Sequence, residues 1–455
     1  MLLFSSVIIT GTGIVLSFLS IWMIYTFLRE RVLRAVLWSV ALFFIPGIMI
    51  FLFAGSLPSS FSTGMVFLIF IVTFFVILPP QVKKVPVDKA PGESLDERDI
   101  MFSRRLLRPG MPEFEDYYSR HPEKKEPDDI FRGKPGLLSP DAKLFDPFTF
   151  FAAGALFDTV ETLAGDVEGG VADQKVTVNP VGMSRLLKSW AKKMGAVSSG
   201  ITGLQHYHFY HTGGRSYNYG EKIVPGHKYA FAFTVEMEEG MIATGPLGPS
   251  VMESATQYLE AGKIAVVLAR YIRKLGYSAR AHIDGHYLVV CPLVARDAGL
   301  GEIGRMGLLM TPRLGPRVRI GVVTTDMPLQ PDQYKEDRTI TDFCIRCMKC
   351  ADNCPVKAIS SRHPKPVRGI TRWQINQEAC YTYWTVTGTD CGRCVAVCPY
   401  SHSDNLFHRL VRLGIRKSWL VNRLALPLDN LFYGRKPIPR QVPEWLNPDT
   451  DRITK

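Results

Sequence analysis

"CIRCMKCADNCP", residues 344 to 355, holds four cysteines separated by two, two and three residues, with a proline after the last. This C-x2-C-x2-C-x3-C-P spacing is typical of chains that bind iron–sulfur cubanes, because it curls the backbone around the cluster. In that arrangement three cysteines hold one cluster and the fourth crosses to another. The stretch therefore predicts a bacterial ferredoxin-like domain with two clusters.

A second group, "CYTYWTVTGTDCGRCVAVCP" at residues 380 to 399, contains the other ligands that two clusters need. The crossing rule assigns one [4Fe-4S] cluster to Cys344, Cys347, Cys350 and Cys398, and leaves the other with Cys354, Cys391 and Cys394. The nearby candidate for its missing thiolate is Cys380. Cys380 reaches the second cluster through the detour "YTYWTVTGTD". One alternative is a [3Fe-4S] second cluster with Cys380 free. Zinc is another, although two groups that end in C-x3-C-P favour iron–sulfur clusters.

The composition of the chain points to more than one structural unit. Its 455 residues include nine cysteines, and 54 Lys and Arg stand against 42 Asp and Glu. Only Cys291 lies outside the two groups, so we expect no disulfide framework. Part of the basic excess flanks apolar segments, where it would set membrane orientation, and we expect no nucleic-acid partner.

The amino-terminal region, 1–81, has the composition of membrane-spanning segments. Charged residues are absent from Leu2 to Leu28 and from Ala35 to Val82. Three transmembrane helices are expected, each close to the ~20 residues that a spanning helix needs, at about 2–28, 35–54 and 61–78. A cleaved signal peptide competes with this interpretation, but it would begin with Lys or Arg and have a shorter apolar core.

Basic residues predict the orientation of these spans. They cluster in the first loop and after the third span, at Arg29, Arg31, Arg34, Lys83, Lys84 and Lys89. Both positions lie on the same side of a three-span bundle. The positive-inside rule predicts that this side faces the cytoplasm. We therefore expect a multi-pass protein of the cell inner membrane whose remaining residues face the cytoplasm.

The rest of the chain divides into four parts. Residues 82–140 are rich in proline and charge, but their aromatic residues predict an extended segment that packs on the core. Residues 141–334 read as an α/β domain. Strands are expected at "KVTVNP", "YAFAFTVEM" and "VRIGVVTTD", and helices at "GMSRLLKSWAKKMG" and about 250–275. The cysteine domain occupies 335–405, and 406–455 form a carboxy-terminal extension.

A glycine-rich stretch, "AGLGEIGRMGLLMTPRLGPRVR", begins at Ala298. Glycines allow the backbone to approach a large flat or anionic ligand closely. The residues expected to do so are Gly299, Gly301, Gly304 and Gly307. The hexapeptide "GLGEIG" has the G-x-G-x-x-G spacing of dinucleotide sites, but it does not follow a clear strand, so that match is weak.

This stretch, together with "LARYIRKLGYSA", "TTDMPL" and the two cysteine groups, resembles the corrinoid-dependent reductive dehalogenases. "LDERDIMFSRRLLRPG" and "DYYSRHPEKKEPDDIFR" resemble the amino-terminal region of that family. The resemblance covers about 94–405. The epoxyqueuosine reductases, a sister family, share the glycine-rich stretch and the detour but not the segment around 94–132.

The resemblance implies a nitroreductase-like α/β domain that binds cobalamin base-off, largely through backbone groups, beside the domain with two [4Fe-4S] clusters. By position, it implies that Tyr258 is the acid near the substrate and Arg319 its basic partner, since a cation favours the phenolate. Tyr277 competes with Tyr258, while Arg305 and Arg317 compete with Arg319. His286 stands where the family often has an asparagine, and we expect it in the cofactor site.

The expected function is therefore that of a membrane-anchored reductive dehalogenase, which removes halogen from an organohalide. Its electron donor would be a ferredoxin, a flavodoxin or a quinol-linked system. "SRRLLRPG" precedes no apolar run and is not expected to be an export signal. Two rivals remain: a corrinoid reductase of a non-halogenated substrate such as an epoxide or a modified nucleoside, and a membrane ferredoxin-type electron carrier.

Overall fold

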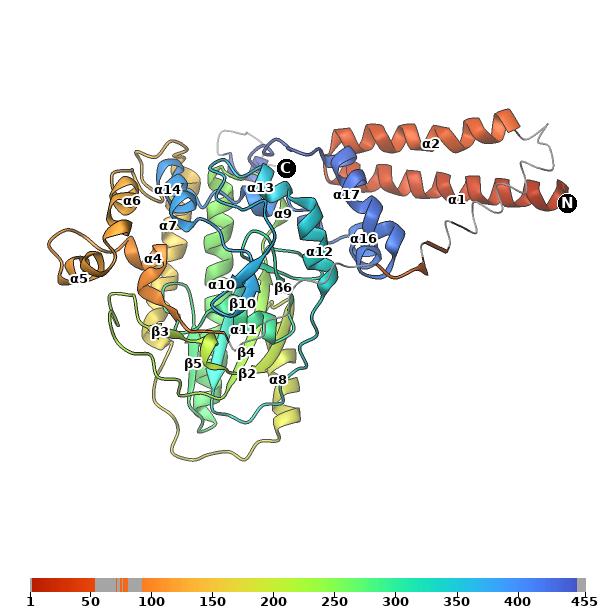
Figure 1. Ribbon diagram of the computed structural model, residues 1–455. Helices are drawn as coiled ribbons and strands as arrows, with labels where there is room; N and C mark the ends of the chain where they lie inside the picture. The colour runs from red at the N-terminus through yellow and green to blue at the C-terminus, as the bar shows by residue number, and fades with distance from the viewer. Residues whose placement is uncertain (1, 54–70, 72–73, 76, 81–91, 448–455) are drawn as a thin grey trace. The chain divides into compact units, whose positions relative to one another are not determined.

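A computed structural model describes residues 2–53, 71, 74–75, 77–80 and 92–447 (Figure 1). The chain divides into two compact units. The α/β unit comprises residues 84–401 and 438–455, and the helical unit comprises residues 1–83 and 402–437. Most of the expected carboxy-terminal extension thus belongs with the amino-terminal helices.

The centre of the α/β unit is a four-stranded antiparallel sheet with the order β2–β4–β8–β5. Its strands are β2 (Ser198–Gly203), β4 (Tyr229–Glu236), β5 (Ala279–His282) and β8 (Val318–Thr325). β4 and β8 pair along their whole length, from Tyr229 opposite Thr325 to Glu236 opposite Val318. The strands expected at "YAFAFTVEM" and "VRIGVVTTD" are therefore confirmed.

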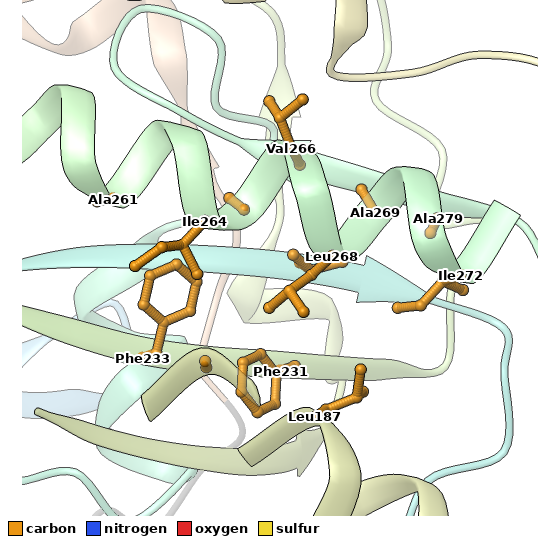
Figure 2. Close-up of a cluster of buried hydrophobic side chains, with 14 of the residues drawn as sticks. Leu187, Phe231, Phe233, Ala261, Ile264, Val266, Leu268, Ala269, Ile272 and Ala279 are labelled. Atoms are coloured by element: carbon orange, nitrogen blue, oxygen red, sulfur yellow. The ribbon is translucent and has the colours of Figure 1, made fainter. Parts of the chain in front are cut away.

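One face of the sheet is covered by the long helix α10 (Gly248–Lys274) and by α8 (Pro180–Lys193). Figure 2 shows the phenyl rings of Phe231 and Phe233 from β4 beneath Ile264 and Leu268 of α10. All four side chains are fully buried. Each contributes about 1.5–3 kcal/mol to folding through the apolar surface it removes from water. Both helices were expected from the sequence, and both are confirmed.

The opposite face is covered by α11 (Cys291–Asp297). Because side chains alternate along a strand, β4 presents small alanines there, Ala230 and Ala232, which allow this helix to lie close. Gly200 of β2 is required for the same reason, since a Cβ atom at this position would lie 2.1 Å from the carbonyl oxygen of Ala298. The close approach of α11 brings the residues around Cys291 to the edge of the sheet.

The strand expected at "KVTVNP" is wrong. These residues form no ladder; Val176 makes one backbone hydrogen bond to Leu275 just after α10. Asn179 instead caps α8 by accepting a hydrogen bond from the amide of Gly182, and Pro180 begins the helix. Proline fixes a backbone angle suited to the first helical turn and cannot donate to a ladder, so the local sequence favours a helix start.

Residues 82–140 were expected to form an extended segment, but the part that the structure describes, from residue 92, is largely helical. It contains β1 (Leu95–Asp96), the 3-10 turn η1 (Glu97–Asp99), α4 (Met101–Arg104), α5 (Pro112–Arg120) and α6 (Pro122–Arg132). Its aromatic residues Phe114, Tyr117 and Tyr118 are buried, as the sequence suggested. Arg104 and Asp128 form a fully buried ion pair between α4 and α6. The segment is therefore held by specific polar contacts as well as by apolar packing.

The remaining elements of the α/β unit are short, apart from α7 (Pro147–Thr162) and α14 (Gln377–Thr387). Around the sheet lie η2 (Leu163–Asp166), η3 (His206–His208), β3 (Tyr210–Thr212), α9 (Glu239–Ile242), β6 (Glu302–Ile303) and β7 (Leu309–Met310). The cysteine domain contains α12 (Arg338–Cys347), α13 (Lys349–Asp352), β9 (Lys365–Val367), β10 (Ile370–Arg372), α15 (Arg393–Ala396) and η4 (Pro399–Ser401). η5 (Glu444–Leu446) is the last described element.

The helical unit contains α1 (Leu2–Arg29), α2 (Leu33–Phe53), α16 (Leu406–Lys417) and α17 (Trp419–Tyr433). Taking the described residues alone, no helix combines the length and the apolar character needed to cross a membrane. The span expected at about 61–78 lies mostly outside those residues, as do many side chains of the spans expected at about 2–28 and 35–54.

A buried polar network joins the end of α1 to α16 and α17. The Glu30 carboxylate accepts hydrogen bonds from Asn405 (2.7 Å), His408 (2.9 Å) and Tyr433 (2.6 Å). Burial alone would raise the pKa of Glu30, but His408 and Tyr433 outweigh it and lower that pKa to about 2. The ionised carboxylate therefore links residues some 400 positions apart in the chain, which explains why 402–437 group with the amino-terminal helices.

Candidate active site and cysteine groups

A cavity of about 190 Å³ lies beside β8, α10 and α11 in the α/β unit. Its walls are mostly apolar and aromatic, with one cation: Tyr210, Tyr258, Tyr287, Val289, Cys291, Pro292, Leu308, Leu309, Pro316, Val318, Arg319 and Ile320. Both residues that the sequence analysis assigned to proton transfer, Tyr258 and Arg319, line it. The structure thus brings this pair together at one cavity, although their catalytic roles stay a prediction.

Arg319 lies over the face of the Tyr258 ring, with 4.5 Å between the guanidinium carbon and the ring centroid. Burial raises the pKa of Tyr258 to about 12, against the opposing charge of Arg319. The phenol is therefore protonated at neutral pH and able to donate a proton. A cation at this distance stabilises the phenolate that remains after donation.

The competing residues lie elsewhere. Tyr277 packs in the core beneath α10 and donates its hydroxyl hydrogen to the carbonyl of Val176 (2.8 Å). Arg305 donates to backbone carbonyls of the cysteine domain, including that of Cys344 (3.0 Å). Arg317 binds the carbonyl of Ser401 (3.0 Å) and the carboxylate of Glu236 (2.8 Å). None of these three lines the described cavity, so their contacts are structural.

Two carboxylates near the pair were not found by sequence reasoning. Asp390 accepts a hydrogen bond from Arg319 at 3.2 Å. Asp284 is half-buried nearby; the loss of solvent raises its pKa, which Arg215 and Arg319 oppose. Asp390 directly precedes Cys391, and this adjacency was the one available signal. The spacing of the cysteines does not show that the Asp390 side chain contacts Arg319.

The four cysteines expected to hold the first cluster surround a small space between α12 and the end of the cysteine domain. Cys344, Cys347, Cys350 and Cys398 line it together with Tyr400 and Arg305. Burial and the neighbouring thiols of Cys344, Cys347 and Cys350 raise the pKa of Cys398. Thiols packed so closely fit an electron-poor metal cluster, which favours their thiolate forms.

The residues between Cys380 and Cys391 help to bring together the cysteines expected to hold the second cluster. Residues 377–387 form α14, which brings Cys380 into the neighbourhood of Cys354 and Cys391. Burial and these two thiols raise the pKa of Cys380 to about 12. The amide of Ala358 donates a hydrogen bond to the sulfur of Cys354 at 3.2 Å. Burial raises the pKa of Cys394, and Cys391, Cys380 and Cys354 lie close enough for their thiols to raise it further. Among the described residues no three or more such side chains are arranged to hold a metal ion, so the assignment of the eight cysteines to two clusters stays a prediction.

Changing Cys380 to alanine is expected to remove iron from the second site only, because the other group shares none of its ligands. The iron content should fall below the roughly eight atoms of two four-iron clusters, and the electron paramagnetic resonance signal of one cluster should persist. Iron assay and spectroscopy of anaerobically purified protein check this. Cys291→Ala is the matched control, and unchanged iron in Cys380→Ala would support the [3Fe-4S] alternative.

The glycines and His286 lie outside the walls of the described cavity. Gly301 and Gly304 have a structural role at the β6–β7 hairpin, since a Cβ atom at Gly301 would lie 2.2 Å from the carbonyl oxygen of Met310. Gly299 and Gly307 have left-handed backbone angles. His286 stacks on Tyr217 and binds Glu161 at 3.0 Å. Cofactor binding by these five residues stays a prediction.

The sheet, the cavity and the cysteine domain make an α/β fold that matches the fold of a solved reductive dehalogenase. Residues 343–402 match the 4Fe-4S dicluster domain. A solved catabolic reductive dehalogenase variant superposes with a TM-score of 0.64 at 23% identity, covering 80% of this chain and 49% of that one.

Sequence comparison finds similarity to proteins of the same kind. The chain is 36% identical over 225 residues to tetrachloroethene reductive dehalogenase of Desulfitobacterium hafniense, covering 46% of this chain and 40% of the relative. It is 35% identical over 210 residues to the enzyme of that name from Sulfurospirillum multivorans, covering 44% and 41%. Epoxyqueuosine reductase of Staphylococcus aureus is less similar, at 28% over 176 residues, covering 33% and 42%. The chain spans about two fifths of the length of these dehalogenases.

Proposed function

We propose that this protein is a reductive dehalogenase that replaces halogen by hydrogen in an organohalide. The observation that carries the proposal is the Tyr258–Arg319 pair at an apolar cavity in a chain with a dicluster domain. The similarity to dehalogenases of tetrachloroethene supports it. A related solved structure contains 3-bromo-4-hydroxybenzoic acid, so the class of organohalide is left open between aliphatic and aromatic compounds.

The residues of the cavity fit a corrinoid by their chemistry. Apolar walls suit a macrocycle, and the described lining contains no imidazole that would bind cobalt. A space of about 190 Å³ holds a small organohalide, so a corrinoid would extend beyond it. Bound there, the corrinoid would supply the strongly reducing cobalt centre that takes the halogen. The cysteine groups would hold the two [4Fe-4S] clusters that deliver electrons.

The protein's own part in the reaction is to exclude water and to supply a proton. Tyr258 donates from its hydroxyl oxygen to the carbon that loses halogen, because its raised pKa keeps it protonated. Arg319, which lies over the face of the ring, stabilises the resulting phenolate. The cavity wall of prolines and aliphatic residues keeps water away, which strengthens this electrostatic effect.

Reduction of a non-halogenated substrate, such as an epoxide, is the second candidate. The similarity to an epoxyqueuosine reductase supports it, although this similarity is lower than that to the dehalogenases. The same acid and electron path would serve it, so substrate screening separates the two. A pure electron carrier explains the clusters but leaves the cavity and its paired tyrosine without a role.

We further propose that the protein is anchored in the cell inner membrane with the α/β unit in the cytoplasm. Large apolar side chains are exposed on the described parts of α1 and α2, with Phe18 and Leu33 each 71% exposed. Basic residues Arg29, Arg31 and Arg34 lie at the connection between these helices, as the positive-inside rule requires of a cytoplasmic loop. A ferredoxin, flavodoxin or quinol-linked donor would then supply electrons from the cytoplasm or the membrane.

Metal analysis tests the proposal directly. Protein purified without oxygen, from cells supplied with cobalamin, is expected to contain about one cobalt and about eight iron atoms per chain. It should release halide from organohalides when a low-potential dye supplies electrons. Iron without corrinoid would overturn the proposal and leave electron transfer as the function, whereas a full cofactor content with epoxide reduction alone would establish the second candidate.

A further inference from the structure

Arg319 is held from two directions. Its guanidinium lies over the Tyr258 ring, and its terminal nitrogen Nη2 donates hydrogen bonds to Ser254 Oγ (2.5 Å) and Asp390 Oδ2 (3.2 Å). The Ser254 hydroxyl in turn donates to the same Asp390 oxygen. Ser254 and Tyr258 are four residues apart on α10, so both face Arg319 from one side of that helix.

Asp390 lies in the loop that carries Cys391, between α14 and α15. It directly precedes Cys391, whose φ of 61° lies in the left-handed region. Thr389 fixes the loop by donating to the carbonyl of Pro246 (2.7 Å) and accepting from the amide of Cys391. The loop also lies very close to Gly245, where a Cβ atom would be 2.6 Å from the carbonyl oxygen of Cys391. The carboxylate is therefore placed by backbone contacts, independently of Arg319.

The surroundings make this carboxylate important for Arg319. The two side chains are only 18% and 13% exposed, so neither charge is well solvated on its own. A buried guanidinium without a partner would be strongly destabilised or would move toward water. Asp284 also lies close enough to act on it by charge, but only Asp390 and Ser254 hold its terminal nitrogen among the hydrogen bonds described.

We propose that Asp390 and Ser254 are positioning residues that hold Arg319 against Tyr258. The loop that carries Cys391 would then also fix the arginine that supports the proton donor. The inference rests on the proposed function for its catalytic meaning. Its consequence is that the electron path and the proton donor share one structural element. When this loop becomes ordered around a cluster, Asp390 would at the same time bring Arg319 into place beside Tyr258.

Asp390→Asn and Ser254→Ala test this in the cofactor-loaded enzyme. A small displacement of a catalytic group costs roughly a hundredfold in rate, so kcat is expected to fall by up to about 10², with KM little changed. Iron and corrinoid content should be unchanged. In a Tyr258→Phe background the same two changes should have no further effect, because the group they position is absent. Asp332→Asn, which removes a carboxylate from the remote pair with Lys188, is the matched control.

A second measurement does not depend on turnover. With 3-fluorotyrosine at position 258, the ¹⁹F resonance should shift in Asp390→Asn and Ser254→Ala but not in Asp332→Asn, since only the first two release Arg319. Equal losses of kcat with and without the Tyr258 hydroxyl, or an unshifted resonance, would overturn the inference. Absence of dehalogenation in a fully loaded wild-type enzyme would instead reject the proposed function, and the resonance would still decide the role of Asp390.

Discussion

Tyr258→Phe is expected to lower kcat for dehalogenation by about 10²–10⁴-fold, the range that a positioned general acid supplies. The change removes one hydroxyl and keeps the ring beneath Arg319, so the cavity should retain its shape. Binding of substrate should change little, and the loss should appear in kcat. Steady-state halide release with dye-supplied electrons measures it, after iron and cobalt contents have been matched to the wild type.

Tyr277→Phe is the control for this experiment. It removes a tyrosine hydroxyl that hydrogen-bonds a backbone carbonyl in the core, and it should cost about 1 kcal/mol of stability without lowering kcat. Because the pKa of Tyr258 is raised to about 12, its deprotonation should not limit the wild-type rate near neutral pH. A Tyr258→Phe enzyme with nearly full activity would show that another group or water supplies the proton.

Arg104→Met is expected to destabilise the α/β unit by about 3–5 kcal/mol, because it leaves a buried carboxylate without its cation. Asp128 is fully buried and, of its hydrogen bonds to described residues, would keep the one from Tyr118 (2.7 Å). Arg104 also binds Glu378 of α14 at 2.9 Å. Denaturant unfolding of the full chain, followed by circular dichroism, measures the loss. Arg104→Met combined with Asp128→Leu should recover part of it, since no unpaired charge remains.

Arg120→Met is the exposed counterpart in the same segment. Arg120 pairs with Asp116 on α5, with side chains 38% and 53% exposed. Solvent screening makes such a pair worth at most about 1 kcal/mol. Equal losses in the two variants would show that burial of the Arg104–Asp128 pair does not determine its contribution.

The sequence is most informative where a residue pattern has one physical meaning. Cysteine spacing predicts the cysteine domain because cluster geometry restricts the chain closely. Apolar alternation and periodicity predict β4, β8 and α10 because these elements are buried. Segment 82–140 is different: its charges suggest solvent, whereas Arg104 and Asp128 are buried because they neutralise each other.

The remaining features depend on contacts between distant residues. "KVTVNP" has strand-like composition, yet within the described part of the chain no strand pairs with it, and composition cannot show that. The contact of Asp390 with Arg319 depends on how one loop packs against α10. The grouping of 402–437 with the amino-terminal helices depends on Glu30 meeting His408 and Tyr433, and neither end of the chain shows this alone.

The ion pair between Arg104 and Glu378 bears on how the protein is made. Glu378 lies two residues before Cys380 and also binds Lys124 at 2.8 Å. Synthesis proceeds from the amino terminus, and early segments fold first. The partners of α14 are therefore already in place when this helix leaves the ribosome. Cys380 therefore meets a docking site made in advance, and α14 is anchored before Cys391 and Cys394 are synthesised.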